Sequence, residues 1–147
     1  GRDLWLLSTG TGLAPFISIL YDFNVWEQYE NILLVHGVRH ASELTYQDAI
    51  ASFASSDYYG EHAHKLKYVQ AISREDAPGA LRGRITTLIE TGELERAIGV
   101  RLDANRSRAM ICGNPDMVDD TRKLLLDRGL TLSRRGQPGH FAVENLW

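Results

Sequence analysis

The sequence predicts an α/β fold of three layers, in which a five-stranded, parallel, Rossmann-like sheet carries helices on both faces. Three observations predict it. Short apolar runs rich in β-forming residues alternate with longer amphipathic stretches. The first apolar run leads directly into a glycine-rich turn and a helix start. The length of 147 residues, 44% of them hydrophobic, suits one domain with a sizeable core.

The expected elements follow from this alternation. The five strands are placed at residues 4–8, 32–37, 66–72, 109–112 and 141–143. The helices are placed at residues 14–21, 43–55, 85–91, 93–98 and 117–128. Ser42 and Asn114 are expected to cap two helix starts, and Gly129 to end the last helix. One domain over residues 1–147 results.

The turn after the first strand is a candidate phosphate site. Gly10 and Gly12 allow dihedral angles closed to other residues and close approach of the backbone to an anion. The helix that follows directs its unpaired N–H groups at the charge, and Pro15 suits its first turn. A proline stands where the dinucleotide fingerprint has its third glycine, so the turn alone also fits an ordinary strand-to-helix connection.

Composition excludes several classes of function. No apolar run is long enough to cross a bilayer and no secretory segment is present, so we expect a soluble cytoplasmic protein. The single Cys112 gives no disulfide framework, and the five His residues show no metal-ligand spacing. With a net charge of −3 and no basic stripe, nucleic-acid binding is disfavoured.

The chain opens with Gly-Arg-Asp directly before an apolar strand, without a Met. We expect from this that it is a domain of a longer protein, whose upstream part lies outside this sequence.

Three arginines follow successive strands of the predicted sheet. Arg39 comes after the second strand, Ser73 and Arg74 come after the third, and Arg84 opens the next helix, where a cation is unfavourable unless an anion binds. Arginine accommodates the 2′-phosphate of NADP, where enzymes preferring NAD place a carboxylate. The arginines favour a 2′-phosphate clamp over a set of solvated surface charges.

The last two strands end in a second group of candidates. Cys112, Gly113 and Asn114 follow the fourth strand, where Cys112 is by default a small buried hydrophobe. The final strand carries Glu144 and leaves Trp147 at its end, to pack on the surface or to stack on an aromatic cofactor.

A family likeness is carried by seven motifs that occur in this order: Ser-Thr-Gly-Thr-Gly-Leu-Ala-Pro-Phe, Val-His-Gly-Val-Arg, Ile-Ser-Arg-Glu, Gly-Arg-Ile, Ile-Glu-Thr-Gly-Glu-Leu-Glu, Met-Ile-Cys-Gly-Asn-Pro-Asp-Met and Gly-His-Phe-Ala-Val-Glu-Asn-Leu-Trp. The chain resembles the NADP-binding half of bacterial ferredoxin/flavodoxin–NADP⁺ reductases, over essentially its whole length. The resemblance implies an oxidoreductase that uses NADP(H) and FAD, with hydride passing between nicotinamide and flavin.

The resemblance also implies roles for single residues. Thr11 would reach the FAD, and Cys112 and Glu144, the catalytic candidates, would lie by the nicotinamide. The cofactor-binding set implied by turn and family together is Gly10, Thr11, Gly12, Val38, Arg39, Ser73, Arg74, Arg84, Gly113, Asn114, Leu146 and Trp147. No metal site is implied.

Two departures from the family pattern qualify these roles. Leu146 stands where relatives with a terminal Trp often carry an aromatic residue, and the flavin-binding motif of the upstream barrel domain is missing. The chain is therefore expected to bind NADP(H) without turning over by itself. Its implied partners are that FAD-binding domain and ferredoxin or flavodoxin, with Arg134 and Arg135 as docking candidates.

Two alternatives remain open from sequence. One is the reductase domain of an oxygenase or flavohaemoglobin-like system, which shares the glycine turn and the Cys-Gly-Asn-Pro segment but usually takes NADH. The other is a nucleotide-binding module without catalytic activity.

Overall fold

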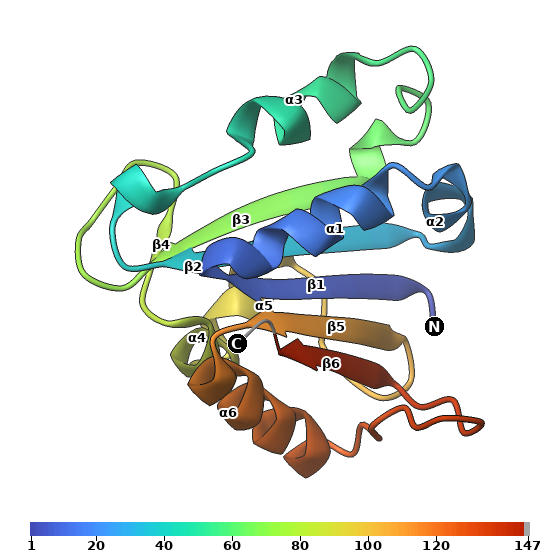
Figure 1. Ribbon diagram of the computed structural model, residues 1–147, viewed down its shortest axis with the longest axis vertical. Helices are drawn as coiled ribbons and strands as arrows, with labels where there is room; N and C mark the ends of the chain where they lie inside the picture. The colour runs from blue at the N-terminus through green and yellow to red at the C-terminus, as the bar shows by residue number, and fades with distance from the viewer. Residues whose placement is uncertain (146–147) are drawn as a thin grey trace.

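The computed structural model describes residues 1–145, which form one parallel sheet covered by helices on both faces (Figure 1). The sheet has six strands in the order β4-β3-β2-β1-β5-β6. Their bounds are Asp3–Thr9 (β1), Asn31–Val38 (β2), Leu66–Ile72 (β3), Leu81–Arg82 (β4), Ser107–Gly113 (β5) and Phe141–Asn145 (β6). The predicted α/β class and parallel sheet are confirmed, whereas the predicted number of five strands is wrong.

The sixth strand, β4, is the one that the sequence did not reveal. It pairs with the end of β3, with Ala71 opposite Leu81 and Ile72 opposite Arg82. Two residues are too few to show the alternation by which a strand is recognised, and Pro78, Gly79 and Gly83 around them indicate a loop.

The core lies in two layers because side chains alternate along the strands. Leu4 and Leu6 of β1 point to the face covered by α1 (Leu13–Leu20), α2 (Phe23–Gln28) and α3 (Gln47–Ser55). Trp5 and Leu7 point to the face covered by α4 (Ile85–Thr91), α5 (Glu93–Ile98) and α6 (Pro115–Asp127). Burial on both sides explains why the middle of β1, Leu4 to Leu7, is a continuous apolar run.

The helix starts show where local sequence decides the structure. Asn114 caps α6, since its side-chain Oδ1 accepts a hydrogen bond from the Asp116 N–H at 2.9 Å, and Gly129 follows the helix with a φ of +87°. Both predictions are confirmed. The expected cap Ser42 is wrong: it lies in a 3₁₀ turn, Ala41–Glu43, and α3 begins only after Tyr46, which has a φ of +59°. The short helix α2 was not predicted.

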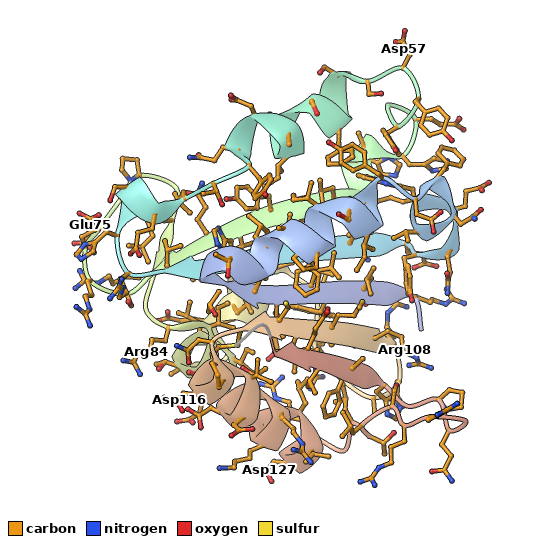
Figure 2. All side chains as sticks on the ribbon, in the orientation of Figure 1. Asp57, Glu75, Arg84, Arg108, Asp116 and Asp127 are labelled. Atoms are coloured by element: carbon orange, nitrogen blue, oxygen red, sulfur yellow. The ribbon has the colours of Figure 1, made fainter. Side chains whose placement is uncertain are left out.

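Different charged residues lie at the two ends of the strands, which we call the carboxyl edge and the amino edge of the sheet. In Figure 1 the strands run from right to left, so their carboxyl ends lie on the left. Figure 2 shows Glu75 and Arg84 at this carboxyl edge and Arg108 at the opposite one.

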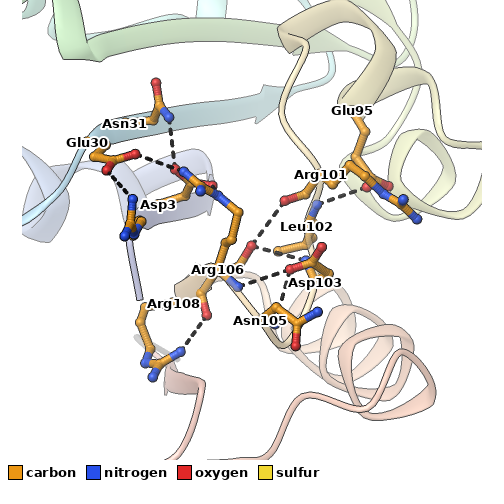
Figure 3. Close-up of polar contacts among 12 residues, drawn as sticks. Asp3, Glu30, Asn31, Glu95, Arg101, Leu102, Asp103, Asn105, Arg106 and Arg108 are labelled. Carbon is orange, nitrogen blue, oxygen red and sulfur yellow. Dashed lines mark hydrogen bonds and ion pairs between the residues drawn. The ribbon is translucent and has the colours of Figure 1, made fainter.

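At the amino edge, the buried Asp3 joins the starts of the central strands (Figure 3). Its carboxylate accepts hydrogen bonds from the Asn31 amide at 2.8 Å and from the Arg106 guanidinium at 3.3 Å. Arg106 also pairs with Glu30 at 2.9 Å, and this hydrogen bond, together with the charges of Arg2 and Arg106, lowers the pKa of Glu30. The stabilisation from Glu30 is therefore present at neutral pH and is lost as the pH falls through its lowered pKa.

Asp3→Ala should lower the free energy of unfolding by about 2–3 kcal/mol, because it removes two hydrogen bonds to a buried, charged acceptor. Urea-induced unfolding measures this, with Asp57→Ala as the matched control. Asp57 is an exposed loop aspartate whose removal should change the free energy by less than about 0.5 kcal/mol. Equal effects of the two substitutions would show that Asp3 does not hold the strand starts together.

Candidate functional site

The candidate site lies where the strand order reverses. Successive strands are added on one side of β1 through β2 and β3, and on its other side through β5 and β6. In parallel sheets of this kind, ligands bind outside the carboxyl ends of the strands at this switch point. Here the loops after β1 and β5 flank it.

The two loops approach each other backbone to backbone. A β-carbon on Gly12 would overlap the carbonyl group of Cys112, and one on Gly113, whose φ is +141°, would overlap Thr9. The Thr9 hydroxyl accepts a hydrogen bond from the Asn114 N–H at 3.0 Å, which ties the loops together. Glycine is therefore required at both positions for lack of space.

Gly10 has a different role, since a β-carbon there would meet nothing within 4 Å. Its φ of +51° lies in the left-handed region and lets the chain turn from β1 into a 3₁₀ turn, Gly10–Gly12, that runs into α1. The start of α1 has no side-chain cap and no acidic residue in its first turn. No acidic side chain of the first turn therefore opposes the positive dipole end of α1, which favours an anion there.

The predicted arginines come together at the same edge. Beyond the ends of β2 and β3, the Ser73 N–H donates to the Val38 carbonyl and the Arg74 N–H to the Arg39 carbonyl, both at 3.0 Å. This places Arg39 and Arg74 on neighbouring chains. Arg84 follows β4 at the start of α4, and it too lies at the carboxyl edge (Figure 2).

The arginines differ in their partners. Arg39 forms an exposed ion pair with Glu43 at 3.2 Å. The pKa of Glu43 is lowered chiefly by a hydrogen bond from the His40 N–H and further by Arg39. Arg74 and Arg84 are exposed, and within residues 1–145 their guanidinium groups form no hydrogen bond or ion pair. Two cations are therefore free to receive an anionic ligand.

The two catalytic candidates lie side by side, with Cys112 of β5 opposite Glu144 of β6. Cys112 is fully buried, and burial first, then the charge of Glu144, raises the pKa of its thiol. A neutral, buried thiol packed in the hydrophobic core is a poor nucleophile. Glu144 is exposed near the end of β6. Their catalytic role stays a prediction, and Leu146 and Trp147 lie outside the described residues.

Three residues of this edge were missed from the sequence. The Thr9 hydroxyl links the two loops through its hydrogen bond with the Asn114 N–H. His36 contacts the glycine turn, with its Nε2 at 3.0 Å from the Gly10 carbonyl oxygen. Glu75 accepts a hydrogen bond from the Ala41 N–H at 2.7 Å beside the arginines. A polar residue at the end of an apolar run, as at His36, was the one available signal.

The described part of the chain offers no sign of a metal centre or a membrane segment. Among residues 1–145 no cluster of three or more His, Cys, Asp and Glu side chains could hold a metal ion. None of the helices within that range is both long enough and apolar enough to span a bilayer.

The parallel sheet and the glycine turn at its switch point are typical of a dinucleotide-binding domain. A family model described as "Oxidoreductase NAD-binding domain" matches residues 6–123, and the chain belongs to this family.

Its relatives include ferredoxin–NADP reductases. The chain is 42% identical to that of Azotobacter vinelandii and 43% identical to that of Pseudomonas aeruginosa, in each case over 98% of this chain and 57% of the relative. A ferredoxin–NADP⁺ reductase from Neisseria gonorrhoeae, solved with bound FAD and NADP, superposes with a TM-score of 0.89 at 35% identity. The superposition covers 100% of this chain and 57% of the Neisseria chain. The chain thus spans little more than half the length of these relatives.

The two glycines of the turn give a matched pair of substitutions. Gly12→Ala should cost about 2–3 kcal/mol of unfolding free energy, because its β-carbon meets fixed backbone atoms. Gly10→Ala should cost about 1 kcal/mol, because only its left-handed conformation is strained. Urea-induced unfolding of both variants checks the order, and a larger loss for Gly10→Ala would contradict the close packing of the two loops.

Proposed function

We propose that the chain is the NADP(H)-binding part of a cytoplasmic ferredoxin–NADP⁺ reductase, in which it positions the nicotinamide for hydride exchange with FAD. One observation carries the proposal: Arg74 and Arg84, whose guanidinium groups have no partner among the described residues, lie at the same end of the sheet as the contact between the loops after β1 and β5. A dinucleotide with an extra phosphate requires both features.

The residues present fit such a ligand. The loop contact brings glycine backbone to the start of α1, which suits a pyrophosphate. The 2′-phosphate distinguishes NADP from NAD, and arginine binds it through paired, charge-assisted hydrogen bonds. Arg39, Arg74 and Arg84 are assigned to the 2′-phosphate end, with Val38 and Ser73 beside the adenosine.

The chain itself binds the dinucleotide and orients its nicotinamide. Gly10, Thr11 and Gly12 hold the pyrophosphate, and Gly113 and Asn114 line the passage toward the nicotinamide. Cys112 is fully buried and supports that passage from the core side, and Glu144 provides a negative charge at the end of β6. The bound nicotinamide and flavin supply the hydride and electron chemistry.

The relatives support the remaining assignments. Because this chain spans 57% of the Azotobacter enzyme and of the Neisseria structure, FAD is assigned mainly to a further domain, with Thr11, Leu146 and Trp147 reaching it from this one. Ferredoxin or flavodoxin is the proposed electron carrier. Arg134 and Arg135, both exposed, are proposed to meet its acidic surface.

Calorimetric titration with NADP⁺ and NAD⁺ tests the proposal. The chain should bind NADP⁺ more tightly than NAD⁺, and Arg74→Ala should weaken NADP⁺ binding by about ten-fold or more while leaving NAD⁺ binding unchanged, since a charge-assisted hydrogen bond is lost.

Arg135→Ala is the matched control for this titration. It removes an exposed arginine from the turn before β6, at the other end of the sheet, and should leave both affinities unchanged. Equal affinity of the wild-type chain for the two nucleotides, or an Arg74→Ala variant that binds NADP⁺ normally, would refute the clamp.

A further inference from the structure

His36 is a buried polar residue that the assignments above leave without a role. It lies in β2 with its side chain fully buried. Its Nε2 lies 3.0 Å from the carbonyl oxygen of Gly10, although the two residues are 26 positions apart in sequence. Its Nδ1 is shielded from solvent and has no hydrogen-bond partner among residues 1–145.

The Gly10 carbonyl fixes the protonation of the ring. A carbonyl oxygen only accepts hydrogen bonds, so Nε2 carries the hydrogen and Nδ1 is bare in the neutral imidazole. Burial lowers the pKa of the His36 imidazole. This effect is larger than the opposing effects of the Gly10 hydrogen bond and the charge of Glu43, which raise the pKa.

The neighbours of His36 in the sheet do not compete for the ring. Ser8 and Gln70 lie opposite it in β1 and β3. The Ser8 hydroxyl donates to the Val35 carbonyl, and the Gln70 amide bonds to Gln47 and Tyr68. Among residues 1–145, the Gly10 carbonyl is thus the hydrogen-bond partner of the imidazole.

This hydrogen bond orients the peptide group of the turn. The C=O and N–H of a trans peptide point in opposite directions, and the described chain has no cis peptide. With the Gly10 carbonyl directed inward to His36, the Thr11 N–H is directed away from it. Gly10 and Thr11 are exposed, and nothing lies within 4 Å of the Gly10 β-carbon position to restrain the turn from outside.

We propose that His36 is a positioning residue for the pyrophosphate turn: its Nε2–H holds the Gly10 carbonyl inward, so that the Thr11 N–H faces the ligand. The proposal rests on the proposed function, because the turn is taken as the pyrophosphate site. It assigns to His36 the orientation of the turn and no contact with the nucleotide.

Two amide variants test this. Gln at position 36 can place an amide N–H near the Nε2 position, whereas Asn carries the same amide but is too short to reach Gly10. The probes are NADP⁺, which contains the pyrophosphate, and 2′-AMP, which contains the adenosine and 2′-phosphate alone. Calorimetric titration gives the affinities, and ¹H–¹⁵N correlation spectra of the ligand-free chain report on the amides of residues 10–12.

His36→Asn should weaken NADP⁺ binding by about ten-fold and leave 2′-AMP binding within about two-fold of the wild type. His36→Gln should recover most of the loss. The amide signals of residues 10–12 should move in His36→Asn and return toward their wild-type positions in His36→Gln. Normal NADP⁺ binding by His36→Asn, an equal loss for both ligands, or no recovery in His36→Gln would overturn the proposal.

The proposed function fails separately from this inference. A wild-type chain that binds neither NADP⁺ nor 2′-AMP contradicts the proposed function. In that case the ligand-free spectra decide on His36, since unchanged signals of residues 10–12 in His36→Asn would show that it does not hold the turn.

Discussion

The loops after β1 and β5 lie in contact at the switch point of the sheet, and the rest of the site depends on this contact. Gly12 and Gly113 leave no room for a β-carbon, and the Thr9 hydroxyl bonds to the Asn114 N–H across the gap. Two helices, α1 and α6, begin directly beyond these loops. Their starts are therefore fixed by backbone packing before any ligand binds, and a pyrophosphate would meet a preformed surface.

Selectivity has a separate origin in the charges at the ends of β2, β3 and β4. The guanidinium groups of Arg74 and Arg84 have no hydrogen-bond or ion-pair partner among residues 1–145, whereas that of Arg39 pairs with Glu43. An anion that binds here competes with Glu43 for Arg39, so the full strength of the three arginines is available only to a ligand as highly charged as a phosphate. Under the proposed function, this arrangement favours NADP over NAD, while the loop contact at the switch point serves both.

Much of this could be predicted from the sequence, because the signals are local. The apolar strands alternate with helices, the glycine turn follows the first strand, and parallel topology brings residues after successive strands to one edge. Arg39, Arg74 and Arg84 were placed together on that basis.

The missed features depend on contacts distant in sequence. The strand β4 consists of two residues and exists through its pairing with β3. The six-residue helix α2 depends on the fully buried Trp26, whose ring packs against Phe53 and Tyr59. His36 contacts Gly10 only in the folded sheet. Tyr46 adopts a left-handed conformation that is usual for glycine, so no signal for it was present in the sequence.

The most direct test of the account is to map NADP⁺ on the chain by ¹H–¹⁵N correlation spectra during a titration. The largest shifts should fall on two groups of amides at the carboxyl ends of the strands: residues 10–12 and 113–114 at the loop contact, and residues 39, 73–74 and 84 around the arginines. Replacing NADP⁺ by NAD⁺ should leave the first group shifted and reduce the second. Shifts confined to another surface, such as the loop of residues 131–139, would contradict it.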